Sequence, residues 1–111
     1  MGGLTALYAL FRRPETFGQA LAMSPSLWVA GGEIFRFIEH TPTPWTARVY
    51  IDAGGYERWL HRAALEMSHL LIRKGLEPGR SLMWRADKRG RHNERSWRRR
   101  LPTALRFLYK R

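Results

Sequence analysis

The chain of 111 residues contains no cysteine, so disulfide bonds and thiolate metal ligands are excluded. It also lacks any apolar run that approaches the roughly 18 residues needed to span a membrane. Its first residues carry neither a basic segment nor a cleavage site, so no signal peptide is recognised and we expect a cytoplasmic protein. The hydrophobic content of 44% is that of a chain that buries a core, and the length allows at most one domain.

Acidic residues are scarce. Nine Asp and Glu face 20 Lys and Arg, for a net charge of +11, and 14 of these 20 basic residues lie from Arg73 onward. Such an excess suggests contact with nucleic acid or another anionic surface. The arginines are, however, dispersed over segments that also carry regularly spaced leucine and tryptophan, as on a solvated face. We therefore expect no specific nucleic-acid binding, and keep a non-catalytic basic binding module as the alternative hypothesis.

Apolar periodicity divides the chain into alternating helices and strands. The predicted helices span residues 3–12, 33–40, 57–74 and 93–109, and the predicted strands span residues 17–23, 47–53 and 81–85. This alternation is typical of right-handed crossovers and a parallel sheet with helices on its faces. The sequence thus predicts an α/β fold, as a fragment of a three-layer αβα sandwich.

The last predicted helix has a mixed pattern. Its buried face is predicted to hold Trp97, Leu101, Leu105 and Leu108. Pro102 stands in its middle, where proline costs about 3 kcal/mol in an undistorted helix, so a kink or a restart is expected there.

A polar loop that contains glycine and one histidine, His92, joins the last strand to this helix. Asn93 is the predicted N-cap and Glu94 lies in the first turn, where the helix dipole favours an anion. Loops between a strand and a helix often carry the general base of an α/β enzyme. The other histidines do not suggest a metal site, because His61 and His69 are eight residues apart, beyond the i, i+4 spacing of helical zinc ligands. No metal or other cofactor is expected.

Four segments resemble known sequence patterns. They are Met1-Gly2-Gly3-Leu4, Leu21-Ala22-Met23-Ser24-Pro25-Ser26-Leu27-Trp28, Tyr50-Ile51-Asp52-Ala53-Gly54-Gly55-Tyr56-Glu57, and Gly90-Arg91-His92-Asn93-Glu94 with the helix after it. The first is similar to the residues after the serine in a Gly-x-Ser-Met-Gly-Gly elbow, and the last to a C-terminal histidine loop. Together they resemble the putative esterase family, the esterase D and enterochelin esterase-like branch of the α/β-hydrolases. Residues 1–111 would form the C-terminal part of that domain, with the nucleophile elbow truncated before residue 1.

The resemblance implies serine-dependent hydrolysis of a small-molecule carboxyl ester. His92 matches the general base of the family. Glu57 best matches the acid that orients the histidine, and Asp52 is the competing acid. These assignments come from the resemblance and not from spacing alone.

Other roles are implied by the same resemblance. The backbone N–H of Met1 matches an oxyanion-hole donor. Ser26 and Trp28 are candidates for substrate binding, Trp28 as an aromatic residue that would line a pocket with Trp59; the alternative for both tryptophans is a place in the core. The nucleophile itself is absent, because the serines of this chain lack a glycine-flanked turn: Ser24, Ser26, Ser68, Ser81 and Ser96. The chain is thus expected to be an inactive fragment. Its strand at 17–23 would expose a sheet edge through which it forms a homo-oligomer.

Overall fold

The computed structural model describes residues 2–44 and 46–109. The elements follow in the order α1 (Gly2–Arg12), β1 (Gln19–Met23), α2 (Val29–Glu39), β2 (Arg48–Gly54), α3 (Arg58–Arg73), β3 (Leu82–Asp87) and α4 (Glu94–Tyr109). This order confirms the predicted alternation, with small shifts at the element ends. Within the described residues, no helix is both long enough and apolar enough to cross a membrane.

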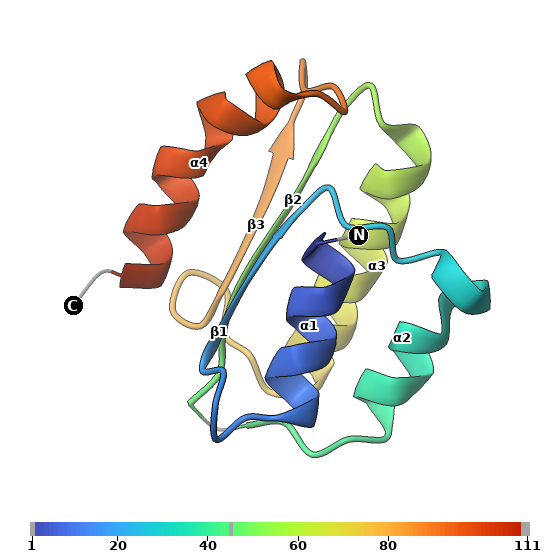
Figure 1. Cartoon of the computed structure of the whole chain (residues 1–111), viewed down its shortest axis with the longest axis vertical. Coiled ribbons are helices and arrows are strands. Elements are labelled where there is room, and N and C mark those ends of the chain that lie inside the picture. The colour runs from blue at the N-terminus through green and yellow to red at the C-terminus, as the bar shows by residue number, and fades with distance from the viewer. Residues whose placement is uncertain (1, 45, 110–111) are drawn as a thin grey trace.

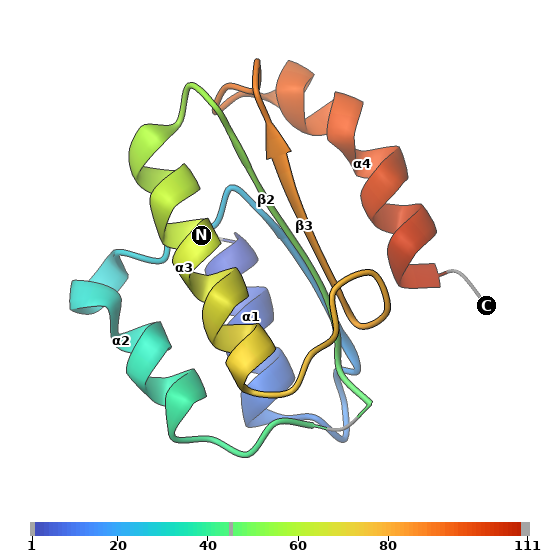
Figure 2. The same cartoon turned by 180° about the vertical axis from the view of Figure 1, so that it is seen from behind.

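The strands form one parallel sheet in the order β1-β2-β3, with β2 in the centre. Helices α1, α2 and α3 lie on one side of the sheet, and α4 lies alone on the other (Figures 1 and 2). The α/β fold and its three layers are therefore confirmed. Because all three strands run in parallel, their carboxyl ends meet at one edge, where parallel sheets commonly bind ligands.

The central strand β2 is buried on both faces, as expected of a parallel strand covered by helices. Val49, Ile51 and Ala53 belong to the larger apolar core, which includes residues of α1, α2 and α3. Tyr50 points the other way, into a smaller cluster with residues of α4. Because side chains alternate along a strand, Asp52 lies on the same face of the sheet as Tyr50, under α4, and has no exposed surface.

The predicted buried face of α4 is wrong in part, because Leu108 is buried and Trp97 partly buried as predicted, but the two leucines between them are not. Leu101 and Leu105 are 38% and 41% exposed, whereas Arg100 is completely buried. The helix is turned so that Ser96, Arg100 and Ala104 face the sheet, because the Arg100 guanidinium meets carboxylates there. Of the kink or restart expected at Pro102, the restart does not occur, since the helix runs through this residue, which is exposed.

The helix ends agree with the sequence signals. The Asn93 side chain accepts a hydrogen bond from the N–H of Ser96 at 2.9 Å, which confirms it as the N-cap of α4. Gly75 has a φ of +109° directly after α3, the conformation that glycine favours at a helix end. Helix α2 begins before the predicted residue 33, but Gly31 and Gly32 have left-handed φ angles, so its regular part starts where the sequence predicts.

Candidate acid–base site

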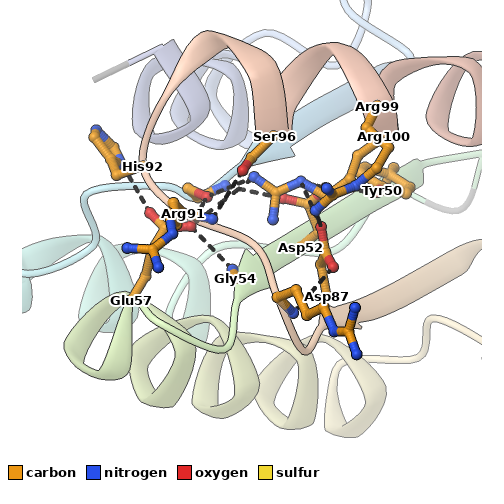
Figure 3. A network of polar contacts seen from close by, with 12 residues as sticks. Tyr50, Asp52, Gly54, Glu57, Asp87, Arg91, His92, Ser96, Arg99 and Arg100 are labelled. Atoms are coloured by element: carbon orange, nitrogen blue, oxygen red, sulfur yellow. Dashed lines mark hydrogen bonds and ion pairs between the residues drawn. The ribbon is translucent and has the colours of Figure 1, made fainter.

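Side chains from the three segments that follow the strands gather at the carboxyl end of the sheet (Figure 3). Ser24 directly follows β1, Glu57 lies in the turn between β2 and α3, and His92 lies in the loop between β3 and α4. The parallel register places Met23 beside Asp52, and Gly54 beside Asp87, so the segments after the strands lie side by side.

Glycines allow the turn after β2 to touch the loop after β3. A Cβ atom on Gly54 would lie 2.1 Å from the carbonyl oxygen of Gly90, and one on Gly55 would lie 2.4 Å from that of Lys88. Two backbone hydrogen bonds join the segments, from Gly55 N–H to Asp87 O at 2.6 Å and from Tyr56 N–H to Gly90 O at 3.2 Å. The main chains thus approach each other as closely as two strands do, which fixes the positions of Glu57 and His92.

His92 and Glu57 form a hydrogen-bonded pair. Nδ1 of His92 lies 2.7 Å from Oε2 of Glu57, with 55% of the histidine side chain exposed but only 4% of the glutamate side chain. The imidazole also stands edge-on to the ring of Trp97, at 4.9 Å between centroids. A carboxylate that accepts the Nδ1 proton leaves the lone pair of a neutral imidazole on Nε2. The half-exposed ring can then accept a proton at Nε2.

The second oxygen of Glu57 is bound separately. Oε1 accepts hydrogen bonds from the Ser24 hydroxyl at 2.7 Å and from the Gly54 N–H at 3.0 Å. A buried carboxylate needs such donors, because burying an unpaired charge is costly. Together the contacts to the two oxygens fix the plane of the carboxylate relative to His92.

Asp52 is placed differently. Its Oδ2 accepts a hydrogen bond from the Tyr50 hydroxyl at 2.6 Å and lies 3.4 Å from Nε of Arg100, while Oδ1 accepts the Ser24 N–H at 3.1 Å. Burial raises the pKa of Asp52 and outweighs these partners, which act to lower it. Burial and the neighbouring Asp52 carboxylate raise the pKa of Tyr50 as well. Of the two candidate acids, the structure brings Glu57, and not Asp52, to His92.

The predicted substrate-binding residues, Ser26 and Trp28, lie in the segment between β1 and α2. Trp28 is 65% exposed and shares a surface depression of about 520 Å³ with Trp59. Trp59 also lines a second depression, of about 390 Å³, together with Tyr56 and His92. Trp59 therefore lies between Trp28 and the imidazole. Ser26 is half-buried in the turn before α2.

The remaining predicted groups are not placed at the imidazole. Met1 lies outside the described residues, and so does the oxyanion-hole assignment made for it. Across residues 2–44 and 46–109, no hydroxyl group forms a hydrogen bond with His92. The Ser24 hydroxyl donates to Glu57, and the Ser96 hydroxyl accepts from the N–H of Arg91. The same residues contain no group of three or more His, Asp or Glu side chains that could hold a metal ion.

Two polar residues of the site were missed from the sequence. Ser24 and Arg100 lie in segments that carry the resemblance, but neither is assigned a role in the site from the sequence, and both are buried here. One signal was available for Arg100. Asp52 interrupts an otherwise apolar buried strand, and a buried carboxylate requires a partner. The sequence did not show which of the basic residues provides it.

Comparison with known proteins supports the resemblance. The model of a family described as "Putative esterase" matches residues 1–108. The crystal structure of the enterobactin esterase FES from Shigella flexneri in the presence of enterobactin is similar, with a TM-score of 0.80 and 29% identity over 93% of this chain. The structure of the same enzyme in the presence of 2,3-dihydroxy-N-benzoyl-serine gives a TM-score of 0.80 and 28% identity over 94% of the chain.

The similarity is confined to part of the solved enzyme. This chain covers only 26% and 28% of the length of those two solved chains. No curated protein sequence matches it.

Proposed function

The chain belongs to the putative esterase family, and from this membership we propose that it supplies the general base and the acid of a serine carboxyl-ester hydrolase. The observation that carries the proposal is the hydrogen bond of 2.7 Å between Nδ1 of His92 and Oε2 of Glu57. The Glu57 side chain is almost fully buried and the His92 side chain is half-exposed. The carboxylate is therefore fixed in place, and a substrate can reach the imidazole. This is the arrangement required of an acid and a base in ester hydrolysis.

In the proposed reaction, Nε2 of His92 removes the proton of a serine hydroxyl as its oxygen attacks the ester carbonyl. The resulting imidazolium is stabilised by the Glu57 carboxylate and then returns the proton to the leaving alcohol. A water molecule repeats the sequence on the acyl-serine, which releases the acid and restores both side chains. Glu57 remains ionised throughout.

The serine is proposed to lie outside the residues that the structure describes. This placement is supported by the contacts of His92, because no hydroxyl within residues 2–44 and 46–109 is hydrogen bonded to it. The small share of the solved relatives that this chain covers agrees with this placement. By this proposal, residues 1–111 are the C-terminal part of a catalytic domain, and the isolated chain does not turn over esters through an acyl-serine.

For the substrate we propose a small ester that carries an aromatic ring. Tyr56 and Trp59 present exposed rings at the depression that His92 lines, and Trp28 presents one at the second depression, which Trp59 also lines. Arg91 stacks on the Tyr56 ring, with 4.4 Å between its Cζ and the ring centroid, which adds a positive charge to this surface. Aromatic rings with an anionic or electron-rich edge suit such a surface, and the ligands of the solved relatives agree with this choice.

The test uses the native protein purified from its source cells, after its intact mass has been measured. A mass well above the 13.0 kDa of this chain is expected. A fluorophosphonate should label one serine, and hydrolysis of an aryl ester should be readily measured. His92→Ala should lower kcat by at least about 10³-fold, and Glu57→Gln should also lower it strongly, because the residues of such a site act as a unit.

The matched control is His69→Ala, which removes an exposed histidine on α3 and should leave kcat unchanged. Full activity in His92→Ala would overturn the assignment of the base. A native mass of 13.0 kDa without ester hydrolysis would overturn the proposal for this polypeptide.

A further inference from the structure

Arg100 has no role in the reaction described above, yet it is completely buried beside the acid. Its Nε lies 3.4 Å from Asp52 and 4.0 Å from Asp87, and its Nη2 lies 3.9 Å from Oε1 of Glu57. A guanidinium without solvent is costly unless carboxylates and hydrogen bonds surround it. The three carboxylates that surround Arg100 offset this cost (Figure 3).

Arg100 reaches Glu57 mainly through Ser24. Nη2 of Arg100 donates a hydrogen bond to the Ser24 hydroxyl at 3.2 Å, and this hydroxyl donates to Oε1 of Glu57 at 2.7 Å. Since arginine has donors only, the serine oxygen must act as the acceptor, which leaves its single proton for Glu57. The positively charged side chain thus determines the direction of the serine hydroxyl.

The backbone of Ser24 supports this arrangement. Its φ is +45°, in the left-handed region that residues other than glycine seldom adopt. Such conformations persist where surrounding contacts determine them, and they cluster at functional sites. Here the Ser24 N–H is bound by Asp52 and the hydroxyl lies between Arg100 and Glu57.

Charge gives Arg100 a second effect on the same group. Glu57 and Asp52 are 8% and 0% exposed, so two carboxylates share a site with little access to water. A cation between them offsets both their mutual repulsion and the loss of solvation. The charge of Asp87 needs Arg100 less, because Asp87 also forms an ion pair with Arg99.

From these contacts we propose that Arg100 is a positioning residue of the acid–base site. Through Ser24 it holds Oε1 of Glu57, so that Oε2 faces His92 and keeps the imidazole proton on Nδ1. The inference rests on the proposed function, but its geometry can be tested without ester hydrolysis. It assigns a specific role to a residue of α4 that does not touch the imidazole.

The experiment measures the tautomer of neutral His92 in the native protein, purified as for the esterase test. The ¹⁵N chemical shifts of the ring give the ratio of the Nδ1–H to the Nε2–H form, and His92→Gln assigns the signals. In Ser24→Gly the hydroxyl is lost at a positive φ that suits glycine, so folding should be retained. The ratio of the Nδ1–H to the Nε2–H form should fall about tenfold. Ser24→Gly removes the hydrogen bond from the hydroxyl to the Glu57 carboxylate, and hydrogen bonds to charged groups are strong enough for a change of this size.

Arg100→Met alone could unfold the chain, because it leaves Asp52 charged and buried without its cation. The double variant Arg100→Met with Asp52→Asn removes both charges and keeps side chains of similar size. It should retain the fold and lower the tautomer ratio at least as much as Ser24→Gly. Arg98→Met, which removes an exposed arginine of the same helix, is the matched control and should leave the ratio unchanged.

A second readout applies to the native esterase. Ser24→Gly and the double variant should lower kcat about tenfold or more with little change in KM, because the groups affected act on the base and not on the substrate. A folded Ser24→Gly and a folded double variant that both keep the wild-type tautomer ratio would overturn the role of Arg100. If the ratio shifts as expected but no variant or wild-type protein hydrolyses esters, the proposed function fails and the positioning role stands.

Discussion

Gly54→Ala offers a direct test of how the acid and histidine segments are held together. The new methyl carbon would lie 2.1 Å from the carbonyl oxygen of Gly90, whereas ordinary contact begins near 3.4 Å, so the segments must separate by about 1.3 Å. Overpacking of this kind costs about 1–3 kcal/mol. The hydrogen bond from the Tyr56 N–H to Gly90 O, which is 3.2 Å long, would also be lost. This loss adds about 1 kcal/mol to the destabilisation. We expect a total loss of about 2–4 kcal/mol in the free energy of unfolding.

Urea unfolding followed by tryptophan fluorescence measures this loss directly. NMR detection of the His92 Nδ1 proton should show in parallel that its hydrogen bond to Glu57, now 2.7 Å, is weakened. Gly18→Ala is the control, since a Cβ there meets no atom within 4 Å and should change stability by no more than about 0.5 kcal/mol. If Gly54→Ala matches this control in both measurements, close contact between the segments does not position the pair.

Three further outcomes are expected from the buried polar groups and the basic surface. Tyr50→Phe removes the hydroxyl that donates to Asp52 at 2.6 Å and should lower the free energy of unfolding by about 1–3 kcal/mol in urea titrations, because a buried acceptor loses its donor. Burial raises the pKa of Asp87, but the hydrogen bond and charge of Arg99 outweigh it, so the pKa lies below the ordinary 3.8. The ionised Asp87 therefore stabilises the fold fully above pH 3.8, and this stabilisation is lost as the pH falls through the lowered pKa. Asp87→Asn should therefore be less stable than the wild type at pH 7, with a difference that narrows below pH 3.8, and a difference that is constant with pH would contradict this assignment. Fluorescence anisotropy with duplex DNA at near-physiological salt should show no binding below about 100 μM, and tighter, salt-sensitive binding would favour the alternative of a basic binding module.

Periodicity was sufficient for the element order but not for the orientation of the last helix. Leucines at 101 and 105 predicted an apolar face, and the rule behind that prediction counts every arginine as outward-facing. Arg100 faces inward because carboxylates on β2 and in two other segments meet it there. These partners are distant in the chain, so no local pattern around Arg100 reveals them.

The acid–base pair shows a similar limit. The sequence places His92 in a loop before a helix, and the resemblance predicts that Glu57 orients it, but neither argument shows how the two segments are held together. That contact depends on Gly54 and Gly55 fitting against the loop of Gly90. In the sequence, Gly54-Gly55 follows the predicted strand at 47–53 and belongs to a segment that carries the resemblance. Its close approach to Gly90 is a property of the tertiary structure.

Helix α4 is the last element in the described order, and this has a consequence for when the site forms. It provides Arg100, and its first turn binds the loop of His92 through the Ser96 hydroxyl and the Arg91 N–H, 2.9 Å apart. Proteins are synthesised from the N-terminus, so the sheet and its acid precede the helix that holds them in place. During synthesis the contact between Glu57 and His92 can therefore gain the support of Arg100 and Ser96 only after α4 has emerged.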